Sequence, residues 1–132
     1  MNRQQQNKAF IVEYYSVMSG AKKKTEALCD QFMEDDKLKE HILFFDSIFP
    51  GYEVFAEEMT AEGDRVIVLA RLLGVHKGAF TGIPPTHKQV NFLFAIGYTI
   101  RERKIVDHWL VADQATLMEQ IGALANPSEQ MT

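Results

Sequence analysis

The chain has 132 residues, a formal net charge of −4, 46% hydrophobic residues and one cysteine, which together predict one domain with a hydrophobic core and exclude an intramolecular disulfide. Its basic residues are scattered apart from those at 22–24, so no phosphate-binding surface and no nucleic-acid partner are predicted. No apolar run is long enough to span a bilayer, and the polar start of the chain lacks the hydrophobic segment of a signal peptide. We therefore expect a cytoplasmic protein with no membrane partner, a single domain over residues 1–132 and an ordered core over about residues 8–125.

Three helices are predicted before any strand. The first spans residues 8–19, where apolar side chains recur at helical spacing, and Gly20 ends it. The second spans 25–34, and the third runs from Leu38 to Phe49, before Pro50 and Gly51. Cys29, on the apolar side of the second helix, is interpreted as a small core residue rather than a nucleophile.

Antiparallel strands follow the helices. Residues 52–60 are β-like, and a turn at 61–64 leads into a second strand over 65–77 that alternates between two faces. One of these faces carries Val66, Val68, Ala70, Leu72, Gly74 and His76. A third strand over 90–101 has its bulky side chains on one face, namely Val90, Phe92, Phe94, Ile96 and Tyr98.

The chain closes with a fourth strand and one more helix. Glu102 and Arg103 form a tight connection into a strand over 104–112. An amphipathic helix then carries Leu117, Ile121 and Leu124, and residues 126–132 form a frayed tail. The order of elements predicts an α+β fold in which the helices gather on one face of a curved sheet. Such a sheet can close over a pocket.

Three motifs resemble one known family. They are G-V-H-K-G-A-F-T-G-I-P-P-T at 74–86, K-I-V-D-H-W at 104–109 and A-D-Q-A-T-L-M-E-Q-I-G at 112–122. Together they resemble the SnoaL-like polyketide cyclase, or ester cyclase, family within the nuclear transport factor two-like superfamily. The resemblance implies a cone-shaped α+β domain that encloses a hydrophobic cavity for a small hydrophobic molecule.

Two positions depart from the family pattern. In the aromatic polyketide cyclases of this family, catalysis uses a histidine on the long third strand and an aspartate two residues after the histidine of the last strand. The corresponding positions here are Ile96 and Leu110. Two functions therefore stay open: acid/base chemistry on a carbonyl-containing substrate by other residues, or binding of a small hydrophobic ligand without catalysis.

His76 and His108 are the predicted proton-transfer groups, because an imidazole titrates near physiological pH. If Ile96 and Leu110 face the pocket, strand alternation places His108 on the same side. His76 interrupts an apolar strand face, so its ring must find a partner or line an opening. We expect the two rings to converge on one cavity; the alternative for each is a core or loop-anchoring histidine.

The other candidate residues are expected to act in the same cavity or to line it. Asp113 is a candidate catalytic carboxylate, although a cap of the last helix is the favoured interpretation. Tyr14 and Tyr15 lie on the helix that roofs the cone in this superfamily, and either phenol can bond a ligand carbonyl or simply fill the core. The predicted substrate-binding residues are Tyr14, Tyr15, Phe92, Phe94, Ile96, Tyr98 and Leu110.

No metal and no cofactor are predicted. The four histidines, His41, His76, His87 and His108, show no paired ligand spacing, and no glycine-rich phosphate loop is present. Trp109 alternates away from His108, onto a sheet face shared with Ile67, Leu69 and Leu93. Because such a face is costly to leave in water, we expect a homodimer formed through the sheet.

Overall fold

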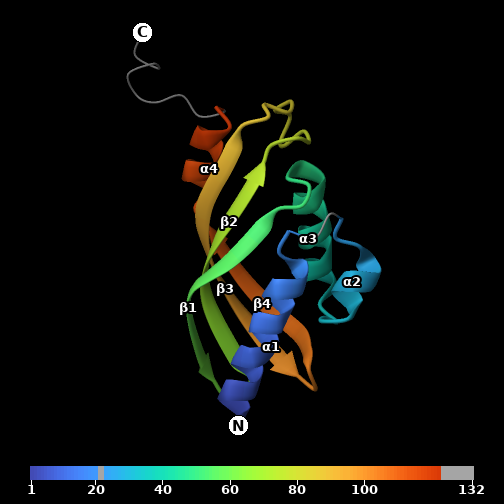
Figure 1. Ribbon diagram of the computed structural model, residues 1–132, viewed down its shortest axis with the longest axis vertical. Coiled ribbons are helices and arrows are strands. Elements are labelled where there is room, and N and C mark those ends of the chain that lie inside the picture. The colour runs from blue at the N-terminus through green and yellow to red at the C-terminus, as the bar shows by residue number, and fades with distance from the viewer. Residues whose placement is uncertain (21–22, 123–132) are drawn as a thin grey trace.

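The computed structural model describes residues 1–20 and 23–122, and it confirms the predicted α+β class. Its elements are α1 (Arg3–Met18), α2 (Glu26–Asp30), α3 (Asp36–Ile48), β1 (Glu53–Glu62), β2 (Arg65–Val75), β3 (Gln89–Arg101), β4 (Lys104–Ala112) and α4 (Gln114–Gln120). The strands form one antiparallel sheet in the order β1-β2-β3-β4. Helices α1, α2 and α3 lie together on one side of the curled sheet, and α4 lies at the end away from the N-terminus (Figure 1). The predicted position of Leu124 and the predicted tail lie outside the described residues.

Side-chain caps decide where the first three helices begin. Asn2 and Gln5 form a reciprocal capping box, so α1 starts at a polar turn that precedes its apolar stripe. Thr25 accepts a hydrogen bond from the Leu28 amide at the start of α2. Asp35 does the same for the Leu38 amide at the start of α3, at 3.0 Å. The first helix is therefore longer at its start than apolar periodicity alone predicted.

Helix α2 is shorter than predicted because the chain after it pairs with β4. The Ile105 amide donates to the Phe32 carbonyl at 2.8 Å, and the Glu34 amide donates to the Ile105 carbonyl at 2.8 Å. Met33 and Ile105 form a parallel bridge. These long-range hydrogen bonds take the Glu34 amide and the Phe32 carbonyl away from the helical pattern, whereas the amides of Phe32 and Met33 still bond to the Cys29 carbonyl.

The predicted strand alternation is confirmed. Val66, Val68, Ala70 and Leu72 are buried beneath the helices, as is His76 just beyond the end of β2. Ile96 of β3 stands opposite Leu110 of β4, and Tyr98 stands opposite His108. On the outer face, a Cβ at Gly97 would overlap the indole of Trp109, so Trp109 lies across this glycine with 42% of its surface exposed. The inner face of the sheet thus carries the large side chains that line the site.

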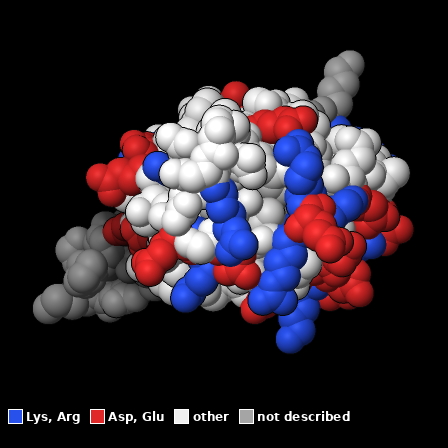
Figure 2. Space-filling model, turned by 90° about the horizontal axis from the view of Figure 1, so that it is seen from below, with Lys and Arg blue, Asp and Glu red and all other residues white. Residues whose placement is uncertain are grey.

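Charges of both signs are interspersed over the end of the molecule nearest the N-terminus. Figure 2 shows lysine and arginine side chains next to acidic ones on this face, without a continuous patch of one sign. Within residues 1–20 and 23–122, no helix has the length and apolar character needed to cross a membrane.

The hairpin between β3 and β4 stores strain that one substitution should relieve. Glu102 and Arg103 have φ angles of +50° and +60°, which residues other than glycine, asparagine and aspartate adopt at a cost. We expect Glu102→Asn to raise the free energy of unfolding by about 0.5–1 kcal/mol, measured by urea denaturation. Glu102→Ala serves as the matched control, because it removes the same side chain and keeps the strain. An equal gain from both substitutions would contradict this explanation.

Candidate active site

A cavity of about 310 Å³ lies between the helices and the inner face of the sheet. Its volume is within the range of small-molecule sites. All seven predicted substrate-binding residues line it, as do Phe45 of α3, Phe80 of the loop after β2, and Leu117 of α4. The sheet provides the floor of the cavity and the helices provide its roof and walls.

Polar groups are few in the cavity wall and uncharged. Within the described part of the chain, no lysine, arginine, aspartate or glutamate lines the cavity. The polar side chains there are His41, Gln114 and all four tyrosines of the chain, Tyr14, Tyr15, Tyr52 and Tyr98. Such a wall suits a largely apolar molecule with a few hydrogen-bonding atoms.

The four tyrosine hydroxyls differ in whether they have a hydrogen-bond partner within the protein. The hydroxyls of Tyr15 and Tyr98 bond to each other at 2.9 Å. Those of Tyr14 and Tyr52 bond to no other group among the described residues, and neither is sealed away from the cavity. Burial raises the pKa of all four phenols, so each remains protonated and able to donate a hydrogen bond.

His41 is the imidazole that the fold places in the cavity wall. It sits on α3 with its ring 4.4 Å from the ring of Phe45. Burial lowers its pKa, and the neighbouring His108 lowers it further. The ring is therefore neutral at physiological pH and can accept a proton. Sequence reasoning missed this residue, although its spacing of three from Leu38 and four from Phe45 places it on the apolar stripe of the helix.

His108 does not line the cavity, contrary to prediction. Its Nδ1 lies 2.6 Å from Oδ2 of Asp35, the residue that caps α3. Both side chains are largely buried. Because a buried carboxylate needs hydrogen-bond donors, Asp35 takes the imidazole of His108 as well as the Leu38 amide. The pair joins β4 to the helix that carries His41.

His76 anchors a loop instead of facing the cavity. Its Nδ1 accepts a hydrogen bond from the Thr86 amide at 3.2 Å and lies 2.9 Å from the Thr86 hydroxyl. Its backbone bonds to Lys88 and His87, and its ring packs against Phe49. The predicted convergence of His76 and His108 on one cavity is therefore wrong, because each ring is held by a partner outside the cavity wall.

Asp113 and Cys29 take the structural places that the sequence favoured. Asp113 caps α4 by accepting hydrogen bonds from the Thr116 amide at 3.1 Å and the Thr116 hydroxyl at 2.7 Å. The hydroxyl and then the amide lower its pKa, and the residue is exposed outside the cavity. Cys29 is fully buried, and burial raises the pKa of its thiol to about 11. Residues 1–20 and 23–122 contain no cluster of histidine, cysteine and acidic side chains suited to a metal ion.

The curved sheet, its helical roof and the enclosed cavity define an α+β domain of the nuclear transport factor two-like fold. The chain belongs to the SnoaL-like polyketide cyclase family, whose model matches residues 35–121, more than half of its length. The match begins at Asp35 and includes His41, the loop held by His76, and all of β1 to β4.

Solved structures share this fold at low sequence identity. AclR, a proposed hydroxylase from Streptomyces galilaeus, is 19% identical, with a TM-score of 0.79 over 97% of this chain and 88% of its own. A proposed SnoaL-like polyketide cyclase from Jannaschia sp. CCS1 is 22% identical, with a TM-score of 0.79 over 95% and 97%. IdmH, a proposed polyketide cyclase from Streptomyces antibioticus, is 18% identical, with a TM-score of 0.73 over 89% and 99%. No curated protein matches the chain significantly in sequence.

Proposed function

We propose that the cavity is the active site of a cyclase-type enzyme that performs acid/base chemistry on a small, largely hydrophobic, carbonyl-containing molecule without a cofactor. The observation that carries this proposal is the neutral imidazole of His41 in a wall whose other residues are apolar side chains, four tyrosines and Gln114. Family membership supports a cyclase-type role. The neighbours of this fold include both a proposed hydroxylase and proposed cyclases, so the residues of the cavity must decide the chemistry.

In the proposed reaction, His41 removes a proton from the carbon next to the ligand carbonyl. The C–H bond breaks, its electron pair enters the enolate, and the proton forms an N–H bond on the imidazole. A tyrosine hydroxyl donates a hydrogen bond to the enolate oxygen, where negative charge develops. The imidazolium then returns the proton to the oxyanion formed on ring closure, or to carbon in an isomerisation. The apolar wall excludes water that would compete for these protons.

The test is exchange of α-protons for deuterium in a bicyclic ketone. We expect the protein to accelerate the loss of the α-proton NMR signals of 2-tetralone in deuterated buffer, above the rate in buffer alone. The assay requires only the first half of the reaction, so the natural substrate need not be known. Binding of 2-tetralone without accelerated exchange would contradict the enzymatic proposal.

A non-catalytic ligand-binding protein is the second candidate. The observation in its favour is that Ile96 and Leu110, the aliphatic side chains at the positions where the family resemblance implies acid/base groups, stand opposite each other and line the cavity. Their contribution to the wall is purely apolar. The exchange assay separates the two candidates, because a binding protein would retain 2-tetralone affinity with no change in exchange rate.

We also propose that the protein forms a homodimer through the outer face of the sheet. Ile67, Trp109 and Val111 are 37%, 42% and 66% exposed there, and a second copy would remove this apolar surface from water. We expect light scattering to give the mass of two subunits, and Val111→Lys to give the mass of one with an unchanged circular dichroism spectrum. A mass near one subunit for the unmodified protein across micromolar concentrations would contradict the dimer.

A further inference from the structure

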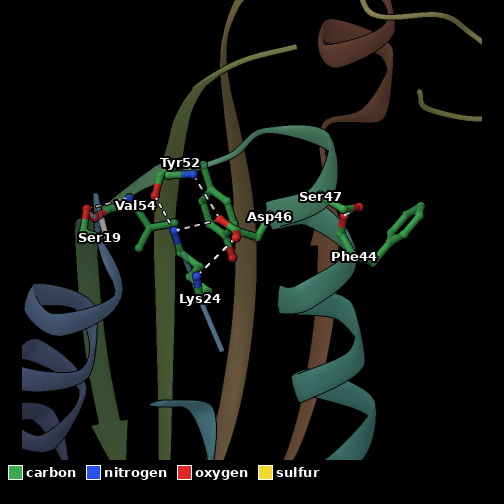
Figure 3. A network of polar contacts seen from close by, with 8 residues as sticks. Ser19, Lys24, Phe44, Asp46, Ser47, Tyr52 and Val54 are labelled. Atoms are coloured by element: carbon green, nitrogen blue, oxygen red, sulfur yellow. Dashed lines mark hydrogen bonds and ion pairs between the residues drawn. The ribbon is translucent and has the colours of Figure 1, made fainter. Parts of the chain in front are cut away.

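Lys24 is a buried lysine directly behind one wall of the cavity. Its side chain is fully shielded from solvent. The ammonium nitrogen donates to the Tyr52 carbonyl at 2.9 Å, lies 3.5 Å from Oδ1 of Asp46, and sits 3.9 Å from the centre of the Tyr52 ring. Figure 3 shows Lys24 between Tyr52 and the Asp46 side chain of α3. All three of its contacts therefore involve Tyr52 or the carboxylate beside it.

Asp46 is the second residue, with Lys24, that holds the start of β1 in place. Besides the Lys24 ammonium, its carboxylate accepts hydrogen bonds from the Lys24 amide at 3.2 Å and the Gly51 amide at 3.0 Å. The clamp, defined as Lys24 and Asp46, thus joins the segment before α2, the last turns of α3 and the residue next to Tyr52. Taking a charge pair out of water offsets most of its attraction, so stability alone gives little reason for an ion pair here.

Tyr52 connects this clamp to the cavity. Its side chain lines the cavity wall, while its carbonyl and one face of its ring are held by Lys24. Burial raises the pKa of the phenol, and Asp46 raises it further, so the hydroxyl keeps its proton. With no partner among residues 1–20 and 23–122, this hydroxyl is a donor available to a ligand in the cavity.

We propose that Lys24 is a positioning residue that fixes the Tyr52 ring, so that the Tyr52 hydroxyl donates the hydrogen bond to the ligand carbonyl in the cavity. This assignment rests on the proposed function of the cavity and names one oxygen-binding group within it. An apolar side chain of similar length would fill the space behind Tyr52. It would hold neither the backbone carbonyl nor the ring face, and a small displacement of a hydroxyl weakens its hydrogen bond strongly.

The test compares two ligands of nearly equal shape, acetophenone and ethylbenzene, of which only the ketone has an oxygen. We expect Tyr52→Phe to weaken acetophenone binding about 3- to 10-fold, the loss of one hydrogen bond, and to leave ethylbenzene binding within about twofold. Lys24→Met should change the ratio of the two affinities in the same direction. The carbonyl stretching band of bound acetophenone should move to higher frequency in both variants, because the hydrogen bond that weakens the C=O bond is lost.

Two further variants make the result specific to the clamp. Lys23→Met removes an exposed lysine next to Lys24 and should leave affinities and band position unchanged. Asp46→Asn removes the ion pair and keeps one side-chain oxygen, which can accept from either the Gly51 amide or the Lys24 amide, because the two amides bond to different oxygens of Asp46. It should shift the band in the same direction by a smaller amount, and it tests the clamp even if Lys24→Met does not fold.

The proposal would be overturned if Lys24→Met and Asp46→Asn weakened both ligands equally with no band shift, since Lys24 would then be structural only. A band shift in Tyr14→Phe and none in Tyr52→Phe would also overturn it, by giving the carbonyl to the other free phenol. These outcomes are separate from failure of the proposed reaction, because binding is measured without turnover and His41 is intact. If neither compound bound, the cavity would not be a site for small hydrophobic ligands, and the assignment of Tyr52 would fail with it.

Discussion

Replacing His41 with glutamine is expected to lower the protein-catalysed exchange of 2-tetralone α-protons by about 10²- to 10⁴-fold, the usual contribution of a positioned acid/base group. Glutamine has a similar size and can still contact Phe45 and Leu38, but it cannot accept a proton at neutral pH. We therefore expect 2-tetralone affinity to remain within a few-fold. NMR-detected exchange and a binding titration on the same samples check both expectations.

His87→Gln is the matched control, because His87 is exposed in the loop after β2 and does not line the cavity. This variant should exchange at the rate of the unmodified protein. An unchanged rate in His41→Gln, with accelerated exchange by the unmodified protein, would show that another group removes the proton.

The pH dependence of exchange should report the environment of His41. Burial and the neighbouring His108 lower the pKa of His41, so the neutral, proton-accepting form persists below the ordinary histidine value of about 6.5. We expect a rate that is constant through neutral pH and falls only on the acid side of that value, as the ring becomes protonated. If lowering the pH already reduced the rate at pH values above the ordinary histidine pKa, the titrating group would have a raised pKa and would not be His41.

Asp35→Ala is expected to lower the free energy of unfolding by about 2–4 kcal/mol. The substitution removes the cap of α3, typically about 1 kcal/mol, and deprives the His108 imidazole of its 2.6 Å partner, typically about 1.5–3 kcal/mol for a bond to a charged group. Urea denaturation monitored by the fluorescence of Trp109, the single tryptophan, measures the change.

Asp35→Asn separates these two contributions. An asparagine oxygen can still cap α3, so the loss should be about 1 kcal/mol smaller than for alanine. Equal losses for alanine and asparagine would assign the whole effect to the contact with His108. A loss below about 0.5 kcal/mol in both would contradict the importance of the pair for holding α3 against β4.

The described secondary structure was largely predictable because each element has a local pattern. The alternation of Val66, Val68, Ala70 and Leu72 indicates a strand with one buried face, whichever strands it pairs with. The end of α2 was not predictable in this way. Thr25 starts the helix locally, but hydrogen bonds to Ile105, distant in sequence, end it at Asp30. Only the folded chain brings that competing partner within reach.

The residues of the cavity were also predictable from the sequence only in part. Strand alternation and the family resemblance correctly placed Ile96, Tyr98 and Leu110 on the face that lines it. The choice among histidines was wrong, because His76 and His108 looked functional as polar residues on apolar strand faces. The structure gives them Thr86 and Asp35 as partners. A histidine's role depends on which groups reach its two nitrogens, and those groups come from other elements.

The sequence by itself determined the α+β class, the family, the buried face of the sheet and the cap made by Asp113, since these follow from side-chain periodicity, motif resemblance and local hydrogen bonding. Tertiary structure alone decided that His41 lines the cavity, that the Tyr14 and Tyr52 hydroxyls have no partner among the described residues, and that a buried ion pair stands behind Tyr52. The physical reason is that burial, hydrogen-bond satisfaction and pKa depend on distances between residues far apart in the chain. Periodicity specifies which face a side chain occupies, while the packing of α3 against the sheet specifies what that side chain meets.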